Sequence, residues 1–312
     1  MNILLHFDAS EALASKANAL CAPFHLNCCP ESSDEAFDAK ICDAEVLWHS
    51  LKPVTAQVIA RAPSLRMIQK IGVGVNTIDL EAAKARGIAV CNLPGANSRA
   101  VAEMALLLML ACLRRLRDLD SAVRVPGGWH AVTGLQDNFA EIGGRTVGMV
   151  GFGSIPQQLA SWLKAMDVRV VYTSRTARQV PYERLALADL LAQSDIVSLH
   201  VPLTEETRGL IGASALSLMK PGAILINTAR GALVNEAPLV AALTSGKLGA
   251  AGLDVFVEEP PPPSNPLLAL PNVVVSPHLA WLTEETIDRS LAIAVENVRR
   301  LSRGDALLNQ VA

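Results

Sequence analysis

The chain has 312 residues, 51% of them hydrophobic, and a formal net charge of −3 at pH 7. Because a single hydrophobic core stops growing at roughly 250–300 residues, this length predicts two domains. The sequence contains no block of Lys or Arg. This disfavours a nucleic acid or an anionic membrane as the partner and favours a small neutral or anionic ligand.

The cysteines and the N-terminus bear on cellular location. The opening MNILLHFDAS has no basic segment followed by a long apolar core, so it predicts a first strand and not a signal peptide. The most apolar segment, residues 104–113, is shorter than the about 20 residues that a membrane span requires. Together these features predict a cytoplasmic protein. Six cysteines without CxxC or Cys/His spacing indicate neither a disulfide framework nor a metal site: Cys21, Cys28, Cys29, Cys42, Cys91 and Cys112.

In the first third of the chain, short β-branched runs alternate with Ala/Leu-rich stretches, which is typical of βαβ units and a parallel sheet. The fold class is therefore predicted to be α/β, and this part forms one small α/β unit. Strands are expected at residues 3–7, 46–48, 67–70 and 88–91, and helices at residues 55–61 and 79–86.

A second α/β alternation follows. Residues 98–117 show one long, largely apolar helix pattern, and residues 125–144 are loop-rich without clean periodicity. Six further strands with helices in most of the gaps match a doubly wound nucleotide-binding domain. A last helix, near residues 283–302, has a pattern that fits packing on either unit. The six strands are expected at residues 146–150, 169–172, 196–199, 223–227, 250–255 and 273–276.

The turn after the strand TVGMV resembles the dinucleotide fingerprint G-x-G-x-x-G. Gly151 permits the tight bend, Gly153 lets the backbone approach a pyrophosphate, and Ser154 and Ile155 supply amide donors at the helix N-terminus. Pro156 replaces the third glycine, which serves helix packing and not phosphate binding. Proline is tolerated in a first helical turn, although overpacking costs ~1–3 kcal/mol, so we expect a slightly displaced helix start. A glycine turn without a ligand is the alternative.

The segment after the next strand bears on which nicotinamide cofactor binds. An NAD enzyme carries Asp or Glu about twenty residues beyond the glycines, and here that position is Thr173. A carboxylate about 4 Å from a 2′-phosphate would cost on the order of 4 kcal/mol, so its absence favours NADP(H). Ser174, Arg175 and Thr176 are expected phosphate partners, with Arg178 a weaker candidate. NAD(H) remains possible, and a solvated basic loop is the alternative.

Three strands of the second unit end in polar residues that suit 2-oxo acid reduction. Arg230 follows INT, Asp254 and Glu259 lie in LDVFVEEP, and His278 ends VVVSPH. Because ligands bind outside the carboxyl ends of parallel strands, these side chains are expected to converge. A cation would hold the substrate, and an imidazolium would give a proton to the carbonyl oxygen. Glu258 competes with Glu259, which we favour because proline follows it. A surface ion pair for Arg230 and a structural role for His278 are the alternatives.

Along nearly its whole length the chain resembles the D-isomer-specific 2-hydroxyacid dehydrogenase family, and it is most similar to the glyoxylate/hydroxypyruvate reductase branch. The resemblance rests on KIGVGVNTIDLEAAKARGI, NSRAVAE, GRTVGMVGFGSI, DIVSLHVPLTEETRGLI, MKPGAILINTARGALV, AAGLDVFVEEP and SPHLAW. It implies two doubly wound parallel-sheet domains. Residues 1–97 with 283–312 would form a flavodoxin-like substrate domain, and residues 98–282 an NAD(P)-binding Rossmann domain. It also implies a homodimer built with the long helix and loop after Ser98.

The same resemblance assigns roles to individual residues. It implies a catalytic triad of Arg230, Glu259 and His278, with Asp254 near the nicotinamide carboxamide. The backbone amides of Val73 and Gly74 would anchor the substrate carboxylate. Two further substrate-pocket candidates are His49 and Trp281. Six residues are expected to line the cofactor: His200, Val201, Pro202, Thr207, Thr228 and Ala229.

These features predict an NADPH-preferring reductase of glyoxylate, hydroxypyruvate or a close relative. The phosphoglycerate dehydrogenase members carry Arg where His49 falls, and the chain ends soon after its last helix without a regulatory domain, so a phosphorylated substrate is disfavoured. Glu259 likewise differs from the Gln of the formate dehydrogenase branch. The alternatives are a reductase of bulkier 2-oxo acids and a cofactor-sensing corepressor on the same fold.

Overall fold

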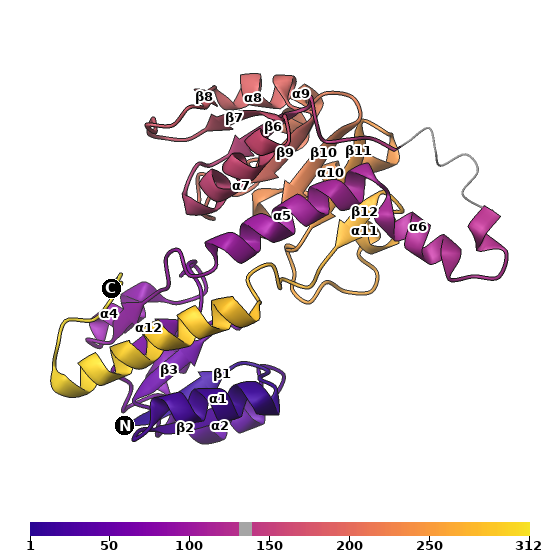
Figure 1. The fold of residues 1–312 in the computed structure, drawn as a ribbon. Helices are drawn as coiled ribbons and strands as arrows, with labels where there is room; N and C mark the ends of the chain where they lie inside the picture. The colour runs from indigo at the N-terminus through magenta and orange to yellow at the C-terminus, as the bar shows by residue number, and fades with distance from the viewer. Residues whose placement is uncertain (131–138) are drawn as a thin grey trace. The chain divides into compact units, whose positions relative to one another are not determined.

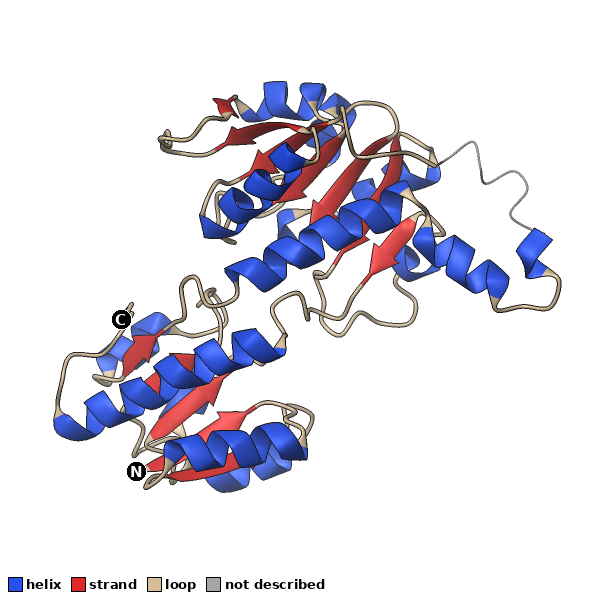
Figure 2. Ribbon diagram, in the orientation of Figure 1, coloured by secondary structure: helices blue, strands red, loops and turns tan. Residues whose placement is uncertain are grey.

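The computed structural model describes residues 1–130 and 139–312, and these residues divide into two compact units (Figure 1). The first unit comprises Met1–Asn97 and Leu282–Ala312, and the second comprises Ser98–Trp281. Each unit is built on one parallel sheet with helices packed on it (Figure 2), so the predicted fold class is confirmed. Within the described residues, no helix is long and apolar enough to cross a membrane.

The first unit has a five-stranded sheet in the order β2-β1-β3-β4-β5. The last helix, α12 (Glu284–Arg303), returns to this unit, where Asn297 is fully buried and donates from Nδ2 to Gln69 Oε1 at 2.7 Å. Such a buried, satisfied amide pair ties the helix to β4. The strands are β1 (Asn2–His6), β2 (His25–Cys29), β3 (Val46–His49), β4 (Met67–Lys70) and β5 (Ala89–Cys91), and the other helices are α1 (Glu11–Cys21), α2 (Asp34–Ile41), α3 (Ala56–Ala60) and α4 (Leu80–Ala85).

The second unit has a seven-stranded parallel sheet in the order β12-β11-β10-β9-β6-β7-β8. All six predicted strands are present, and the edge strand β8 (Glu183–Arg184) is an addition. The other strands are β6 (Thr146–Val150), β7 (Arg169–Thr173), β9 (Ile196–Leu199), β10 (Ala223–Asn227), β11 (Leu248–Leu253) and β12 (Val273–Val275). The helices between them are α7 (Ser154–Ala165), α8 (Leu187–Gln193), α9 (Ala213–Leu218), η3 (Gly231–Leu233), α10 (Glu236–Thr244) and α11 (Pro266–Ala269).

The helix predicted for residues 98–117 is shorter than expected. α5 (Ser98–Leu113) packs on β10, β11 and β12, and Arg115 then adopts a φ of 49°. This left-handed conformation cannot continue a right-handed helix, so the chain turns and begins α6 (Leu116–Val123). The predicted loop at residues 125–144 contains the short helix η1 (Gly128–His130), and its residues 131–138 lie outside the described part.

Candidate active site

The cofactor turn has the geometry that a pyrophosphate requires. Gly151 has a φ of 96°, and a Cβ there would lie 2.8 Å from the carbonyl carbon of His200, so the fold itself demands glycine. Gly153 has an ordinary φ of −87°, and a Cβ there would meet no described atom within 4 Å. No protein neighbour therefore requires a glycine at this N-cap. It fits instead the close approach of a ligand phosphate to the amides of Ser154 and Ile155.

Pro156 occupies the third position of α7 and is buried. The helix begins at Ser154, directly after the N-cap Gly153, so the proline does not delay its first residue. The missing N–H falls among the first four amides, which have no intrahelical acceptor. The Ser154 hydroxyl lies 2.8 Å from the Ser98 hydroxyl, which links the starts of α5 and α7. The first turn of α7 thus keeps the amides that a phosphate would use.

The loop after β7 has more internal order than its sequence indicates. The Ser174 hydroxyl donates to the carbonyl oxygen of Thr176 at 2.6 Å, so its proton is used within the loop. The Arg184 guanidinium donates to the carbonyl oxygens of Ser174 and Arg175. Arg175 and Thr176 are exposed. Of the predicted phosphate partners, Arg175 and the weaker candidate Arg178 have exposed charged side chains. Arg184 is a residue that sequence reasoning missed.

The opposite wall of the turn is formed by the segment after β9. The His200 amide donates to the Val150 carbonyl at 2.7 Å, and Val201 Cγ1 lies 3.0 Å from where a Gly151 Cβ would be. Burial lowers the pKa of His200 to about 3, so the ring is neutral at physiological pH. Thr207 donates from its hydroxyl to the Pro202 carbonyl at 2.7 Å and braces this loop.

Two buried polar atoms in this region lack a partner among the described residues. They are His200 Nε2 and Thr228 Oγ1. Next to Thr228, the Ala229 amide donates to Asn227 Oδ1 at 3.0 Å, which holds the loop after β10. Because buried polar groups in native proteins are nearly always hydrogen-bonded, these two atoms fit contact with a bound ligand. The residues present therefore suit a dinucleotide in the way the sequence predicts.

His278 and Glu259 form a hydrogen-bonded pair at the carboxyl edge of the sheet. His278 Nδ1 lies 2.6 Å from Glu259 Oε2, and Glu259 Oε1 accepts from the Phe256 amide at 3.0 Å. Burial raises the pKa of Glu259, but the hydrogen bond and charge of His278, the Phe256 amide and the charge of Arg230 together leave the pKa below its usual value. Glu258 is exposed and makes no such bond within the described residues. The preference for Glu259 over Glu258 therefore agrees with the geometry.

Asp254 holds the turn that carries His278. Its carboxylate is fully buried and accepts from the amides of Leu279 and Ala280, each at 3.0 Å, and from the Ser276 hydroxyl. The His278 amide donates to the Asp254 carbonyl at 2.7 Å, and His278 has a φ of 57°. Burial raises the pKa of Asp254. Asp254 therefore holds the turn that carries His278, and its expected place near a nicotinamide carboxamide stays a prediction.

Arg230 reaches the same edge from the loop after β10. Burial lowers its pKa and the charge of Glu259 opposes this, yet an arginine stays protonated in proteins. Its Nη1 donates to the Ala229 carbonyl at 2.6 Å. A Cβ on Gly231 would lie 1.9 Å from the carbonyl carbon of Phe256, so glycine alone lets this loop press against the segment that leads to Glu259. The structure therefore gathers the three predicted catalytic side chains in one unit.

The candidate substrate residues of the first unit divide into two kinds. Val73 and Gly74 follow β4 and are partly exposed, and neither amide donates a hydrogen bond to a described residue. Free neighbouring amides of this kind suit an anion. His49 is fully buried, with Nε2 2.8 Å from Thr77 Oγ1, and burial together with the charge of Lys70 lowers its pKa well below the usual value. His49 is thus a neutral interior residue, and Trp281, 8% exposed in the second unit, is also largely packed.

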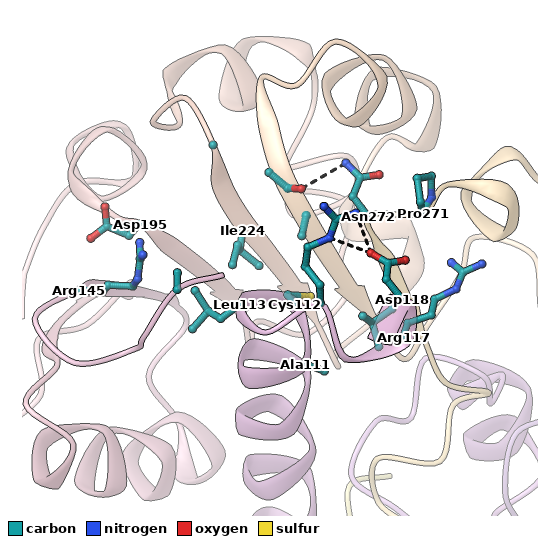
Figure 3. A pocket seen from close by; sticks show the side chains of 16 residues that line it. Ala111, Cys112, Leu113, Arg117, Asp118, Arg145, Asp195, Ile224, Pro271 and Asn272 are labelled. Carbon is teal, nitrogen blue, oxygen red and sulfur yellow. Dashed lines mark hydrogen bonds and ion pairs between the residues drawn. The ribbon is translucent and has the colours of Figure 1, made fainter. Parts of the chain in front are cut away.

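A cavity of about 320 Å³ lies at the other edge of the seven-stranded sheet, where the strands begin (Figure 3). Figure 3 shows Arg145 beside Asp195 on one side of this cavity and Asp118 on the other. Asp195 accepts from Lys220 Nζ at 2.9 Å and from the Thr146 amide at 2.8 Å, and Asp118 pairs with Arg115 at 2.7 Å. Both carboxylates that line the cavity therefore already have partners. The cavity lies at the opposite edge of the sheet from Arg230, Glu259 and His278.

Comparisons with known proteins agree with this geometry. Residues 106–280 match the family model described as "D-isomer specific 2-hydroxyacid dehydrogenase, NAD binding domain". The chain is 41% identical over 286 residues to a glyoxylate reductase of Aeropyrum pernix, covering 89% of this chain and 85% of that enzyme. It is 39% identical over 271 residues to a D-3-phosphoglycerate dehydrogenase of Archaeoglobus fulgidus, covering 85% of this chain but only 51% of that one.

Solved structures of the same fold carry either nicotinamide cofactor. An NAD-dependent formate dehydrogenase from Staphylococcus aureus, in complex with NAD, has a TM-score of 0.89 at 27% identity and covers 100% of this chain and 99% of its own. An acyclic imino acid reductase in complex with NADPH and D-Arg has a TM-score of 0.83 at 26% identity and covers 100% of both chains. The likeness supports a nicotinamide cofactor without distinguishing NAD from NADP.

Proposed function

Because the chain belongs to the D-isomer-specific 2-hydroxyacid dehydrogenase family, we propose that it reduces small 2-oxo acids, such as glyoxylate or hydroxypyruvate, with a preference for NADPH. The observation that carries this proposal is the His278–Glu259 pair beside the charge of Arg230. An acid, its carboxylate partner and a fixed cation are the groups that reduction of a carbonyl next to a carboxylate requires.

Each group of the triad has a distinct task in this proposal. The Glu259 carboxylate stays ionised and holds His278 at Nδ1, so Nε2 is the atom that gives a proton to the carbonyl oxygen of the substrate. Arg230 stabilises the negative charge of the substrate and of the developing alkoxide. Asp254 fixes the turn through two backbone amides and thereby sets the position of the imidazole. A nicotinamide cofactor, which Gly151, Gly153 and the first amides of α7 would hold, would supply the hydride.

The division of labour between the units is part of the proposal. Residues 98–282 would bind the dinucleotide through Gly151, Gly153 and the first amides of α7. Residues 1–97 with 283–312 would bind the substrate, with the amides of Val73 and Gly74 holding its carboxylate. These two amides are supported by their lack of acceptors among the described residues. His49 is too deeply buried to take part directly.

The preference for NADPH is supported by the loop after β7. Thr173 ends the strand where an acidic residue would repel a 2′-phosphate, and no Asp or Glu occurs in residues 173–182. Arg175 is exposed beside it. A loop with two exposed cations, Arg175 and Arg178, and no anion favours the cofactor that carries the additional phosphate.

A homodimer is also part of the proposal. α6 has no buried residue. Its Leu116 and Val123 side chains are each 51% exposed, and Trp129 in η1 is 71% exposed. Apolar side chains gathered on one protruding segment indicate a surface that a second protein covers. Since most soluble oligomers are symmetric homo-oligomers, a second copy of this chain is the expected partner.

One steady-state experiment tests the function. Purified protein is assayed with glyoxylate, hydroxypyruvate, pyruvate and bulkier 2-oxo acids against both NADPH and NADH. We expect the highest kcat/KM for glyoxylate or hydroxypyruvate with NADPH. A higher kcat/KM for a bulky 2-oxo acid would correct the substrate. Equal or higher efficiency with NADH would overturn the preference, and no turnover with any acid would favour a cofactor-sensing binding protein.

A further inference from the structure

The two-residue strand β8 lies at the edge of the seven-stranded sheet, and its two side chains make separate contacts. In the β7–β8 register Arg184 lies opposite Tyr172, close to where β7 ends and the cofactor loop begins. Glu183 pairs with Arg169 of β7 at 2.8 Å, away from that loop. Arg184 instead turns to the loop that is proposed to face the adenosine 2′-phosphate. In the edge strand, Glu183 thus contacts the sheet and Arg184 contacts the loop.

The contacts of Arg184 form a fork on consecutive carbonyl groups. Its Nε and Nη2 donate to the Ser174 carbonyl oxygen at 3.1 and 2.7 Å, and Nη2 also donates to the Arg175 carbonyl oxygen at 3.1 Å. The next carbonyl, that of Thr176, accepts from the Ser174 hydroxyl at 2.6 Å. Three successive carbonyl oxygens, the groups that would repel a phosphate, are therefore occupied by donors of the protein.

The amides of the same three residues, unlike their carbonyl groups, have no hydrogen-bond partner among the described residues. Within the described structure, none of the backbone N–H groups of Ser174, Arg175 and Thr176 donates to a protein atom. A turn whose carbonyls are bound and whose amides are free has the polarity of an anion-binding nest. Arg175 and Arg178 add positive charge, and the next acid after the loop, Glu183, is paired with Arg169. The loop therefore presents its N–H groups and a positive charge together.

We propose that Arg184 is a positioning residue for NADPH, which holds the 174–176 loop in the conformation that receives the 2′-phosphate. This inference rests on the proposed preference for NADPH. A phosphomonoester carries about −1.5 to −2 charges at pH 7, so it depends on a fixed array of donors far more than a ribose hydroxyl does. Lysine cannot replace the fork, because it is a single point charge without the two parallel donors of a guanidinium.

The test compares three variants by direct binding. Dissociation constants of NADPH and NADH are measured by fluorescence titration of the full chain for wild type, Arg184→Gln, Arg184→Lys and Arg169→Gln. Arg169→Gln is the matched control, because it removes the exposed arginine that contacts the other residue of β8. Thermal unfolding of each variant reports whether the fold is retained.

We expect Arg184→Gln to weaken NADPH binding about 5- to 20-fold, the range for loss of charge-assisted hydrogen bonds at a partly exposed site, and NADH binding less than about 3-fold. Arg184→Lys should not restore NADPH affinity, and Arg169→Gln should retain it. Equal losses for both cofactors, or rescue by lysine, would overturn the positioning role. If wild type itself binds NADH as tightly as NADPH, the preference fails first. If wild type prefers NADPH and Arg184→Gln does not alter this, the positioning role alone fails.

Discussion

Replacing Gly231 by alanine tests whether the catalytic loop depends on its close contact with the segment that leads to Glu259. The added Cβ would lie 1.9 Å from the carbonyl carbon of Phe256 and 2.0 Å from its oxygen. Ordinary van der Waals contact begins at 3.4 Å, so one backbone segment must move by about 1.5 Å. The atoms that this Cβ would meet all belong to the backbone, so no flexible side chain can move to relieve the contact. The displacement therefore changes the distance between Arg230 and Glu259.

Two measurements follow from this displacement. A misplacement of about 1 Å in an active site can cost about 10²-fold in rate, so we expect kcat/KM of Gly231→Ala to fall by about that factor. Overpacking of a dense site should also lower the free energy of unfolding by about 1–3 kcal/mol, measured by urea denaturation.

The matched control is Gly143→Ala in the same unit. A Cβ there would meet its nearest atom, the Met166 carbonyl oxygen, only at 3.4 Å, and its φ is not left-handed. Its rate and stability should stay close to wild type. If Gly231→Ala keeps kcat/KM within about 3-fold of wild type, the loop tolerates the displacement and the argument from this contact is refuted.

Three further changes have definite outcomes. His278→Asn should reduce kcat, measured across the pH–rate profile, by ~10²–10⁴-fold if His278 is the general acid. Only a small decrease in kcat would refute that role. Pro156→Gly should leave the NADPH dissociation constant within about 3-fold, because the first-turn amide it restores has no helical acceptor; a large gain in affinity would show that the ring displaces the phosphate. Burial lowers the pKa of His6 from 6.5 to about 4, so as the pH falls His6 is protonated in the unfolded chain before it is protonated in the folded chain. The free energy of unfolding therefore decreases between pH 6.5 and 4, by at most about 3 kcal/mol. His6→Gln should weaken that pH dependence in thermal unfolding, and an unaltered slope would show that other groups cause it.

Elements with a strong local pattern were predictable from the sequence. The β-branched strands of the second unit lie where expected, since parallel strands buried on both faces are continuous apolar runs. β2, with the sequence HLNCC, was missed because it has no β-branched residue and depends on pairing with β1. The two residues of β8 carry no periodicity at all. The break after α5 depends on one left-handed residue, Arg115, which no apolar pattern indicates.

The identity of the candidate catalytic residues was also available from the sequence, because polar residues after apolar strands indicate the carboxyl edge of a parallel sheet. The family resemblance found through these motifs is confirmed by the comparisons. The individual roles of Arg230, Glu259 and His278 stay predictions until they are measured. The fold adds the contacts that hold them, such as the hydrogen bond between His278 Nδ1 and Glu259 Oε2.

Only the tertiary structure decided how these residues are held. Asp254 supports the His278 turn, Arg184 binds carbonyls ten and nine residues before it, and His49 is sealed in the interior of the first unit. The reason is physical. Strand and helix patterns come from the alternation of neighbouring residues along the chain, whereas a hydrogen bond or a buried position depends on which distant segments pack together. Local sequence therefore determined the fold class and the chemistry at the strand ends, and tertiary packing determined which groups are exposed to perform it.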